Sequence, residues 1–464
     1  MQELTPRKIM TPRLIVLLVV LGAGLIVLTY IHLIYVPYMR DLNDDEGYDF
    51  DDLNLEGIGI PSDPYLIRTA EDLAELAFKV NAGSSYKDTF FVLMNDIDLI
   101  PYLERNNTFW VPIGINGASF SGIFDGTGHT ISGVWVFQPG AGDGGLFGWL
   151  VDAEIYNLNV EAISIAARDN VGALAGMQTG GKIINCTVKV ENLRANGSSM
   201  RGIGGLVGWQ AGEALIDNCR AEIDIYIDIT GVTYLGGLVG RSENSTIRGS
   251  SAEVSLHIDN DGYYLSAGGL VGTLNEESII TTSRASGEVT INGPENSFVS
   301  IFGGFAGVSH GSIGTSYSSV NIMSVIMRGA AGGFVGLQSE GEIINCFATG
   351  NVSGYMGNSA GFMREQGSGA RVLNCYYAGV VRTIDEYDPI AFVVNQSGII
   401  ENSFFDKDLT GDNSVYVKSN FATGEAVGRT TEEMQSRDTF EGWDFISTWH
   451  IPEDGGYPRF MLIF

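Results

Sequence analysis

The chain has 464 residues, of which 62 are glycine, about twice the usual share, and only 12 are proline. Its 55 acidic and 26 basic side chains give a formal net charge of −29, which argues against nucleic acid as a partner, because few cations are present to neutralise phosphates. Hydrophobic residues make up 44 % of the chain, so it is not an acidic disordered tail. The glycines have no three-residue period, which excludes collagen.

The amino-terminal segment predicts a membrane anchor. Residues 14–36 carry no formal charge and, as a helix, are long enough to cross a hydrocarbon core of about 30 Å. Arg7, Lys8 and Arg13 precede this run. Because a basic flank stays on the inner side, the long carboxyl-terminal part is expected outside. The run exceeds a signal-peptide core and no small-x-small site follows it, so we expect a basic cytoplasmic tail over 1–13 and an uncleaved transmembrane signal anchor over 14–36.

Residues 37–63 predict an acidic linker. After Arg40 this segment contains many Asp and Glu residues and neither Lys nor Arg. Repulsion between like charges keeps such a segment extended. The linker therefore separates the predicted anchor from the remainder of the chain.

Beyond the linker, a pentad of small and apolar residues bounded by glycines repeats about every 30 residues. Complete copies occupy Gly144–Gly148, Gly172–Gly176, Gly204–Gly208, Gly236–Gly240, Gly268–Gly272, Gly303–Gly307 and Gly332–Gly336, and degenerate copies occupy Ala360–Arg364 and Ile390–Val394. No unit contains a stretch of helical period long enough for a helical repeat, and each unit is too short for a four-stranded propeller blade. We therefore predict a parallel β-solenoid with one unit per coil and coils about 4.8 Å apart.

Glycine and asparagine have separate expected roles in these coils. The glycines are expected to permit positive φ at corners and to let consecutive coils turn without a Cβ clash. A second motif runs in phase, with an apolar residue two positions before an asparagine, and its asparagines should form a ladder of side-chain amides from coil to coil. The members are Asn157, Asn185, Asn218, Asn345, Asn374 and Asn402.

These pentads, with Ile-x-Asn-Cys in phase, resemble the GLUG-motif repeat proteins, surface proteins of bacteria and some archaea. Related repeats lie beside the catalytic part of some immunoglobulin A-cleaving metallopeptidases. The segments 64–83, 91–99 and 120–134 also resemble the lead-in to the repeats of that family, and 402–411, 428–445 and 455–460 resemble its closing segment. The resemblance implies an all-β, right-handed parallel β-helix with short capping helices, to which the uncharged run over 14–36 adds one N-terminal transmembrane helix. We expect an N-terminal cap and first coils over 64–140, the repeats over 141–405 and a C-terminal cap over 406–464.

Both ends of the solenoid should be covered, because an open end exposes unpaired strands and the core. Residues Thr69–Asn81 predict a capping helix, since Thr69 is a good N-cap residue and acids follow it. Thr430 is expected to begin a second short helix at the far end. Aromatic cover there is assigned to Phe440, Trp443, Phe445, Trp449 and Tyr457.

The search for an enzyme centre finds no catalytic residue. None of the five histidines is followed by glutamate, so the His-Glu-x-x-His zinc motif is absent and the metallopeptidase activity of the related group does not carry over. A polysaccharide-active β-helix enzyme is the lesser alternative. Its candidate carboxylates are Glu222 and Glu253, which the repeat phase places on adjacent coils, with Lys189 one coil earlier. We expect a protein that is not an enzyme.

Calcium is the one ion for which weak candidate ligands exist, and no other cofactor is expected. Asp406, Asp408 and Asp412 lie in one turn, and Asp259 and Asp261 in another, and carboxylate oxygens are the ligands that calcium takes. Exposed aspartate-rich turns without an ion are the more common arrangement.

The four cysteines occupy one column of the repeat. Cys186 and Cys219 fall on neighbouring coils, and so do Cys346 and Cys375. Coil spacing lies within the Cα range for a disulfide, and an external compartment permits oxidation. Two intercoil disulfides and a ladder of small buried thiols therefore both fit, because serines occupy this column on other coils.

These observations predict a single-pass membrane protein with an extracellular carboxyl-terminal domain on a prokaryotic cell surface. Its partners would be the membrane, through residues 14–36, and an extracellular glycan or protein ligand, with no nucleic acid. The expected function is to display a rigid surface for adhesion or binding. The alternative is a structural component of the cell envelope or of an appendage.

Overall fold

The computed structural model describes residues 53–461 except 141, 196–200, 230, 261–262, 294–299, 326–328, 356–357, 385–387, 412, 414 and 454. The predicted anchor over 14–36 and the tail over 1–13 lie outside the described residues. Within the described part of the chain, no helix is both long enough and apolar enough to cross a bilayer.

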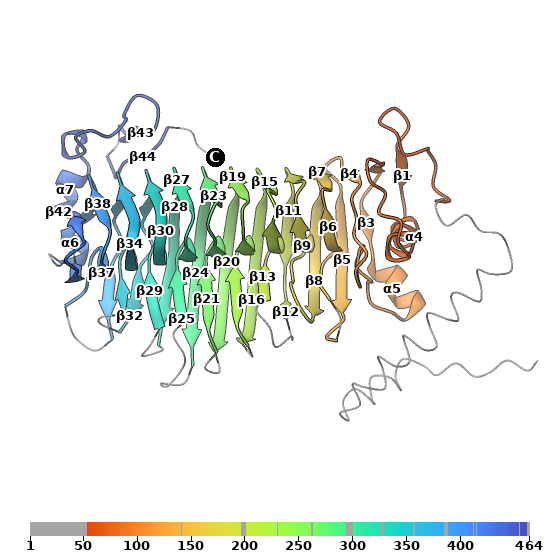
Figure 1. Ribbon diagram of the computed structural model, residues 1–464, viewed down its shortest axis with the longest axis horizontal. Coiled ribbons are helices and arrows are strands. Elements are labelled where there is room, and N and C mark those ends of the chain that lie inside the picture. Colours follow the sequence, from red (N-terminus) through yellow and green to blue (C-terminus); the bar gives the residue numbers. More distant parts are fainter. Residues whose placement is uncertain are drawn as a thin grey trace, which may run out of the picture.

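The chain winds into a rod of stacked coils, with the amino-terminal coils at the right of Figure 1 and the carboxyl-terminal coils at the left. Neighbouring coils pair in parallel along three sheets, as the repeat predicts. One coil contains, in order, β13 (Arg201–Gly204), β14 (Val207–Ala211), β15 (Leu215–Asp217) and β16 (Arg220–Ile229). Among the described residues, the first sheet has 21 strands, the second 15 and the third 6.

The first sheet receives two strands from most coils. Its strands are β1 (Tyr65–Ile67), β2 (Phe90–Leu93), β4 (Ile123–Asp125), β6 (Phe147–Val151), β7 (Glu154–Tyr156), β9 (Ala175–Thr179), β10 (Lys182–Ile184), β14, β15, β18 (Val239–Ser242), β19 (Thr246–Arg248), β22 (Val271–Leu274), β23 (Ile279–Thr281), β26 (Ala306–Ser309), β27 (Ser312–Gly314), β30 (Val335–Ile344), β34 (Met363–Leu373), β37 (Val393–Gln396), β38 (Ile399–Glu401), β40 (Val415–Lys418) and β41 (Thr423–Gly424).

The other two sheets complete each coil. The second sheet contains β3 (Ile97–Asp98), β5 (Thr130–Phe137), β8 (Asn159–Ala167), β11 (Thr187–Val190), β12 (Leu193–Ala195), β16, β20 (Ser251–Asn260), β24 (Arg284–Asn292), β28 (Tyr317–Ser324), β31 (Phe347–Ala348), β32 (Val352–Gly354), β35 (Tyr376–Tyr377), β36 (Val381–Thr383), β39 (Phe404–Asp406) and β42 (Val427–Arg429). The third sheet contains β13, β17 (Thr233–Gly236), β21 (Leu265–Gly268), β25 (Ser300–Gly303), β29 (Gly329–Gly332) and β33 (Ser359–Ala360).

The pentads form the corner between the third sheet and the first. Their central apolar residues point into the rod, and Leu206, Leu238 and Leu270 are fully buried in successive coils. A Cβ built on Gly237 would lie 2.1 Å from the carbonyl oxygen of Gly269, so a side chain cannot fit between these coils. The expected Cβ clash is therefore present. The expected positive φ is not, because the residues with positive φ do not include the pentad glycines.

Positive φ occurs instead at glycines between two strands of the first sheet, such as Gly180 and Gly212, and along the asparagine column, at the corner between the first and second sheets. Asn157, Asn185 and Asn218 have φ of 49°, 55° and 52°, a conformation that asparagine tolerates better than most residues. Asn185 Nδ2 donates to Asn157 Oδ1 at 3.2 Å, and Asn218 Nδ2 donates to Asn185 Oδ1 at 2.7 Å. The predicted ladder resumes at Asn374, whose Nδ2 donates to Asn345 Oδ1 at 3.3 Å.

The amino-terminal end is covered by the helix that the sequence predicts. Helix α4 (Ala70–Asn81) begins after Thr69, whose side chain accepts a hydrogen bond from the backbone of Asp72 while the Asp72 carboxylate accepts from the backbone of Thr69. Leu73, Leu76 and Val80, on the inner face of this helix, are fully buried. A second helix that the sequence did not predict, α5 (Ile100–Asn106), lies beside it.

The carboxyl-terminal segment contains α6 (Lys407–Thr410), α7 (Thr431–Met434), a 3-10 turn η2 (Arg437–Thr439) and the antiparallel pair β43 (Trp449–His450) and β44 (Arg459–Phe460). Thr430 caps α7, as predicted. The aromatic residues of this segment cover the outer side of the second sheet as well as the end of the rod. Trp443, Trp449 and Phe460 pack on a stack of rings that follows the outer side of the second sheet, formed by Tyr317, Phe347, Tyr376 and Phe404.

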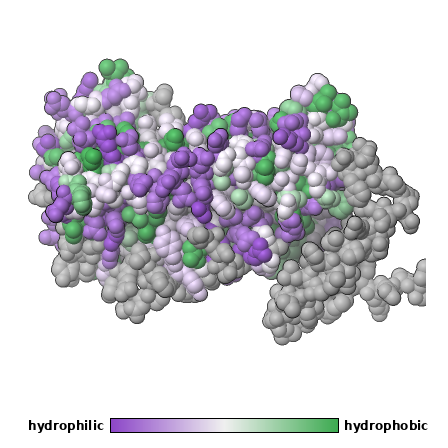
Figure 2. Space-filling model, in the orientation of Figure 1, coloured by the Kyte–Doolittle hydropathy of each residue, from purple (hydrophilic) through white to green (hydrophobic). Residues whose placement is uncertain are grey.

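The surface of the rod is mainly polar. On the face seen in Figure 2, hydrophilic residues predominate over the coils and hydrophobic residues are scattered, with more of them at the amino-terminal cap. Outward positions of the strands alternate with buried ones, as in β20, where Ala252, Val254 and Leu256 are buried. The side chains available to a ligand are therefore those of the outward columns.

Candidate ligand-binding groove

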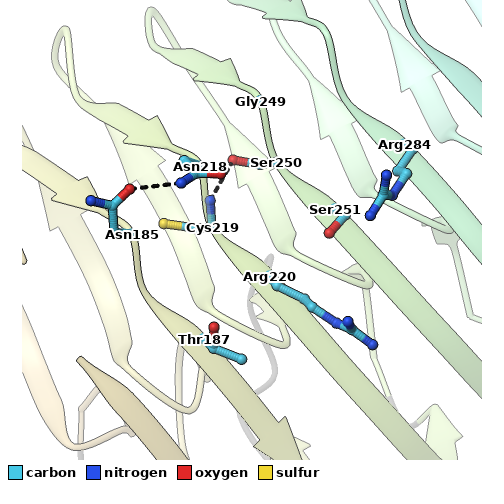
Figure 3. A pocket seen from close by; sticks show the side chains of 9 residues that line it. All are labelled: Asn185, Thr187, Asn218, Cys219, Arg220, Gly249, Ser250, Ser251 and Arg284. Atoms are coloured by element: carbon cyan, nitrogen blue, oxygen red, sulfur yellow. Dashed lines mark hydrogen bonds between the residues drawn. The ribbon is translucent and has the colours of Figure 1, made fainter. Parts of the chain in front are cut away.

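A polar groove of about 300 Å³ lies at the corner between the first and second sheets. Figure 3 shows it from close by. Its lining is made of amides, hydroxyls, one thiol and two guanidinium groups, from Asn185, Thr187, Asn218, Cys219, Arg220, Gly249, Ser250, Ser251 and Arg284. The volume is at the lower end of the range for small-ligand sites.

The groove exists because the asparagine ladder is interrupted. Gly249 occupies the position that asparagine holds on the two preceding coils, with a φ of 58°, and it has no side chain to continue the ladder beyond Asn218. A Cβ built on Gly249 would have its nearest neighbour at 3.7 Å, which is ordinary van der Waals contact. The corner therefore has room for a side chain that the sequence does not supply, and this leaves the surface hollow.

One wall of the groove is a column of outward residues on the second sheet. Thr187, Arg220, Ser251 and Arg284 are paired in register across β11, β16, β20 and β24. At the usual strand spacing of about 4.8 Å, the two arginines are about 10 Å apart along the rod, with Ser251 between them. Figure 3 shows both arginine side chains extending over the same face.

Arg220 is held from the neighbouring outward column. Its Nη2 lies 2.8 Å from Glu253 Oε2 and 3.8 Å from Glu222 Oε2, and Lys189 Nζ lies 3.7 Å from Glu222 Oε1. Exposed ion pairs of this kind contribute about 0.2–1 kcal/mol, so they orient the side chains more than they stabilise the fold. The lining of the groove itself contains no carboxylate.

The same ion pairs bear on the candidate catalytic carboxylates. The structure places Glu222 and Glu253 in register on adjacent coils, and Lys189 on the coil before them. Both carboxylates are exposed and face cations at close range. They therefore lack the enclosed, apolar surroundings of a glycosidase general acid.

The cysteines lie where the repeat predicts and are buried thiols in this structure. Cys219 Sγ donates to the carbonyl oxygens of Asp217 and Ile183, at 3.3 and 3.5 Å. Burial raises the pKa of the Cys219 thiol well above its usual value, and the same holds for Cys346. Neither is activated as a nucleophile, since the thiolate is the reactive form. The pairs Cys186–Cys219 and Cys346–Cys375 share one column, and their oxidation stays a prediction.

The aspartates proposed for calcium are engaged within the chain. Asp406 is fully buried, and its Oδ2 accepts from Tyr457 Oη at 2.6 Å and from the Thr431 hydroxyl at 2.7 Å, which joins α7 to the last coil. Asp408 accepts from the backbone of Thr431 at 2.8 Å.

Asp259 accepts from the Tyr226 hydroxyl and from Asn292 Nδ2. Asp261 and Asp412 lie outside the described residues. Across the part of the chain that the structure describes, no group of three or more His, Cys, Asp or Glu side chains is arranged to hold a metal ion.

Sequence reasoning missed the groove, although one signal for it was present. The Asn-Cys of two successive units becomes Gly249-Ser250 in the next unit. Arg220, Ser251 and Arg284 each lie two residues after the asparagine-column position of their own coil. This signal can be interpreted only when the register of the paired coils shows that these residues line one groove.

The fold defines the class: a repeat protein built as a parallel β-solenoid. The family model of the GLUG motif matches residues 231–256 and 327–353. Both matches fall within the repeated coils, and further copies of the pentad occupy the coils between and around them. The chain therefore carries GLUG motifs among the repeated coils of a parallel β-solenoid.

Similar proteins differ widely in length. A protein of Evansella cellulosilytica named as a Gly-rich membrane protein is 31 % identical over 441 residues, which cover 88 % of this chain and 46 % of that protein. The immunoglobulin A1 protease of Streptococcus sanguinis is 29 % identical over 35 % of this chain and 8 % of its own length. Halomucin of Haloquadratum walsbyi is 30 % identical over 36 % of this chain and 2 % of its own. The chain thus spans less than half of each relative.

Among solved structures, one from Bacteroides ovatus named as an immunoglobulin A1 protease aligns with a TM-score of 0.40 and 18 % identity, over 87 % of this chain and 94 % of that one. A second structure, named IgA1 protease, aligns with a TM-score of 0.40 and 20 % identity over 67 % of this chain and 21 % of that one.

Proposed function

We propose that the chain is a membrane-anchored surface protein whose right-handed β-helix displays a rigid surface for binding an extracellular glycan or protein. Residues 14–36 would hold it in the membrane, and residues 37–63 would space the rod from the bilayer. The uncharged run with its basic flank supports the anchor. The similarity to a Gly-rich protein named as a membrane protein supports the same location.

The observation that carries the binding function is the groove at Gly249. The coils that form it are paired on both sides, since β16 pairs with β11 and β20, and β20 pairs with β24. Its side chains are therefore held by the sheets and not by a flexible loop. A preorganised site loses little freedom when a ligand binds, which favours affinity.

The location is tested in bacterial cells that express the full chain. We expect the protein in the membrane fraction, resistant to alkaline extraction, and we expect protease added to intact cells to remove the rod. A variant with Val20→Lys and Leu25→Glu is the matched control, because each charge at a helix centre costs about 2.5–3.5 kcal/mol of insertion free energy. A wild-type chain that is extracted as readily as this variant, or that protease does not reach, would overturn the proposed location.

A structural role in the cell envelope is the second candidate, and one observation favours it. In the described residues, β40 of the last coil pairs only with β37, and Val417 and Phe421 near this edge are 49 % and 79 % exposed. An open strand edge with exposed apolar side chains is a template for another strand. Concentration-dependent assembly of the full chain in detergent, abolished by Val417→Lys, would support this role over ligand binding.

A further inference from the structure

We infer that the groove at Gly249 binds an anionic polysaccharide, whose acidic groups are received by Arg220 and Arg284 and whose hydroxyls meet the serine, threonine and asparagine side chains between them. This inference rests on the proposed binding function and names the class of ligand for its site. It follows from the charge of the lining, the spacing of the arginines and the form of the surface.

The charge of the lining is opposite to that of the chain. Acidic side chains outnumber basic ones by 55 to 26 overall, yet the nine lining residues include two arginines and no acid. A guanidinium presents several N–H donors in one plane and matches the geometry of a carboxylate or sulfate. The two guanidinium groups are therefore the charged donors that the groove offers to an anionic ligand, although Arg220 also contacts Glu253 from the neighbouring column.

The guanidinium group of Arg220 is oriented by its ion-pair partners outside the groove. Glu253 contacts only one of its terminal nitrogens closely, at Nη2, and stands in the neighbouring column. Holding one edge of the guanidinium fixes the plane of the group. An incoming anion can then meet the guanidinium without ordering a free side chain, which lowers the entropy cost of binding.

The spacing of the arginines suits a polymer that lies along the rod. Arg220 and Arg284 are two coils apart, about 10 Å, and the hydroxyl of Ser251 lies in register between them. A chain with acidic groups at intervals of that order meets both cations at once. Binding at the second arginine is then effectively intramolecular, so two weak contacts give a useful affinity.

The form of the surface favours a sugar polymer over an acidic peptide. Peptides commonly add a strand to an open sheet edge or insert apolar side chains into pockets. Neither feature is present here, since β16 and β20 are paired on both sides and the lining supplies hydroxyls, amides and guanidinium groups. Such a lining matches the hydroxyls and acidic groups of a polysaccharide.

The break in the asparagine ladder offers a variant that closes the groove without disturbing the coil. Gly249→Asn places a side chain where the nearest atoms to its Cβ are 3.7 and 3.8 Å away. Asparagine already adopts this conformation at Asn185 and Asn218, so the ladder should extend by one rung. We expect this variant to fold with wild-type stability or better and to fill the groove.

The test measures binding of the full chain, in detergent micelles, to polygalacturonate, to its fully methyl-esterified neutral form, to dextran sulfate and to polyglutamate. We expect both anionic polysaccharides to bind and the neutral ester to bind at least about tenfold more weakly. Because each substitution removes one charge-assisted hydrogen bond, Arg220→Gln and Arg284→Gln should each weaken binding about tenfold or more. Gly249→Asn should weaken polysaccharide binding by a similar factor, and the melting temperature of this variant should be no lower than that of the wild type.

Arg371→Gln is the matched control, because Arg371 Nη2 forms an intercoil pair with Glu401 at 2.8 Å like that of Arg220 but lies outside the groove. Equal losses in this control, or equal binding of the neutral ester, would overturn the inference. Preference for polyglutamate would also overturn it, in favour of an acidic peptide. These outcomes are separate from the proposed function, because surface location and binding of another ligand at the rod would be unaffected.

Discussion

Replacing Gly237 with alanine should strongly destabilise the rod. The new Cβ would lie 2.1 Å from the carbonyl oxygen of Gly269, 2.5 Å from Val254 Cγ1 and 2.8 Å from Ala252 Cβ. Overpacking in a core usually costs about 1–3 kcal/mol. Here the closest atom belongs to the backbone of the next coil, so relief also weakens intercoil hydrogen bonds worth about 1 kcal/mol each. We expect a loss of about 3–5 kcal/mol.

The assay is urea unfolding followed by circular dichroism, with hydrogen exchange to locate the damage. Because each coil contacts only its neighbours, protection should fall first in the coils on either side of Gly237. Gly314→Ala is the matched control, since its Cβ would meet nothing nearer than 3.8 Å and its φ is not positive. It should be neutral or stabilising by about 0.4–1 kcal/mol. Equal free energies of unfolding for the two variants would refute the argument from coil spacing.

Three further predictions concern other parts of the rod. Cys219→Ser should change the free energy of unfolding by less than about 1 kcal/mol, because Ser250 in the same column already donates to a carbonyl two residues earlier at 2.8 Å, and urea titration checks this. Trp449→Ala should cost about 3–5 kcal/mol and expose the ring stack, seen as increased binding of a hydrophobic dye, since Trp449 is fully buried. Hydrogen bonds from Ser447 and from the backbone of Ile446 lower the pKa of Asp444 to about 2, so its stabilisation is present above about pH 4 and is lost as the pH falls toward 2. Melting temperatures of wild type and Asp444→Asn should therefore differ at pH 6 and converge at pH 2, and a constant difference would contradict this.

The repeat predicted the coils well because its period reports a physical constraint. Gly237 and its counterparts lie where consecutive coils come closest, and this column holds glycine on most coils and alanine, the next smallest residue, at Ala173 and Ala391. The asparagine column was predicted for the same reason, since one corner recurs on each coil. The positive φ of this column was predicted for the pentad glycines instead. Glycine and asparagine both tolerate positive φ, and sequence alone does not say which corner needs it.

The carboxyl-terminal segment was harder to predict because it does not repeat. Its helix after Thr430 has a local signal, the capping box with Glu433. The packing of Trp449 and Phe460 against Phe347 depends on contacts more than a hundred residues apart, which no local pattern encodes. The groove was missed because it forms where a side chain is absent, at Gly249, and the sequence signal for it can be interpreted only once the register of the coils is known.

The asparagine column makes each coil a separate opportunity for a binding site. Asparagine at this corner gives a closed, hydrogen-bonded surface, while glycine keeps the backbone conformation and removes the side chain, as at Gly249. The exchange costs the fold little, because both residues accept the same φ. A solenoid of this kind can therefore gain, lose or move a recognition site along its length by changes at one position per coil. The core and the register of the rod stay as they are.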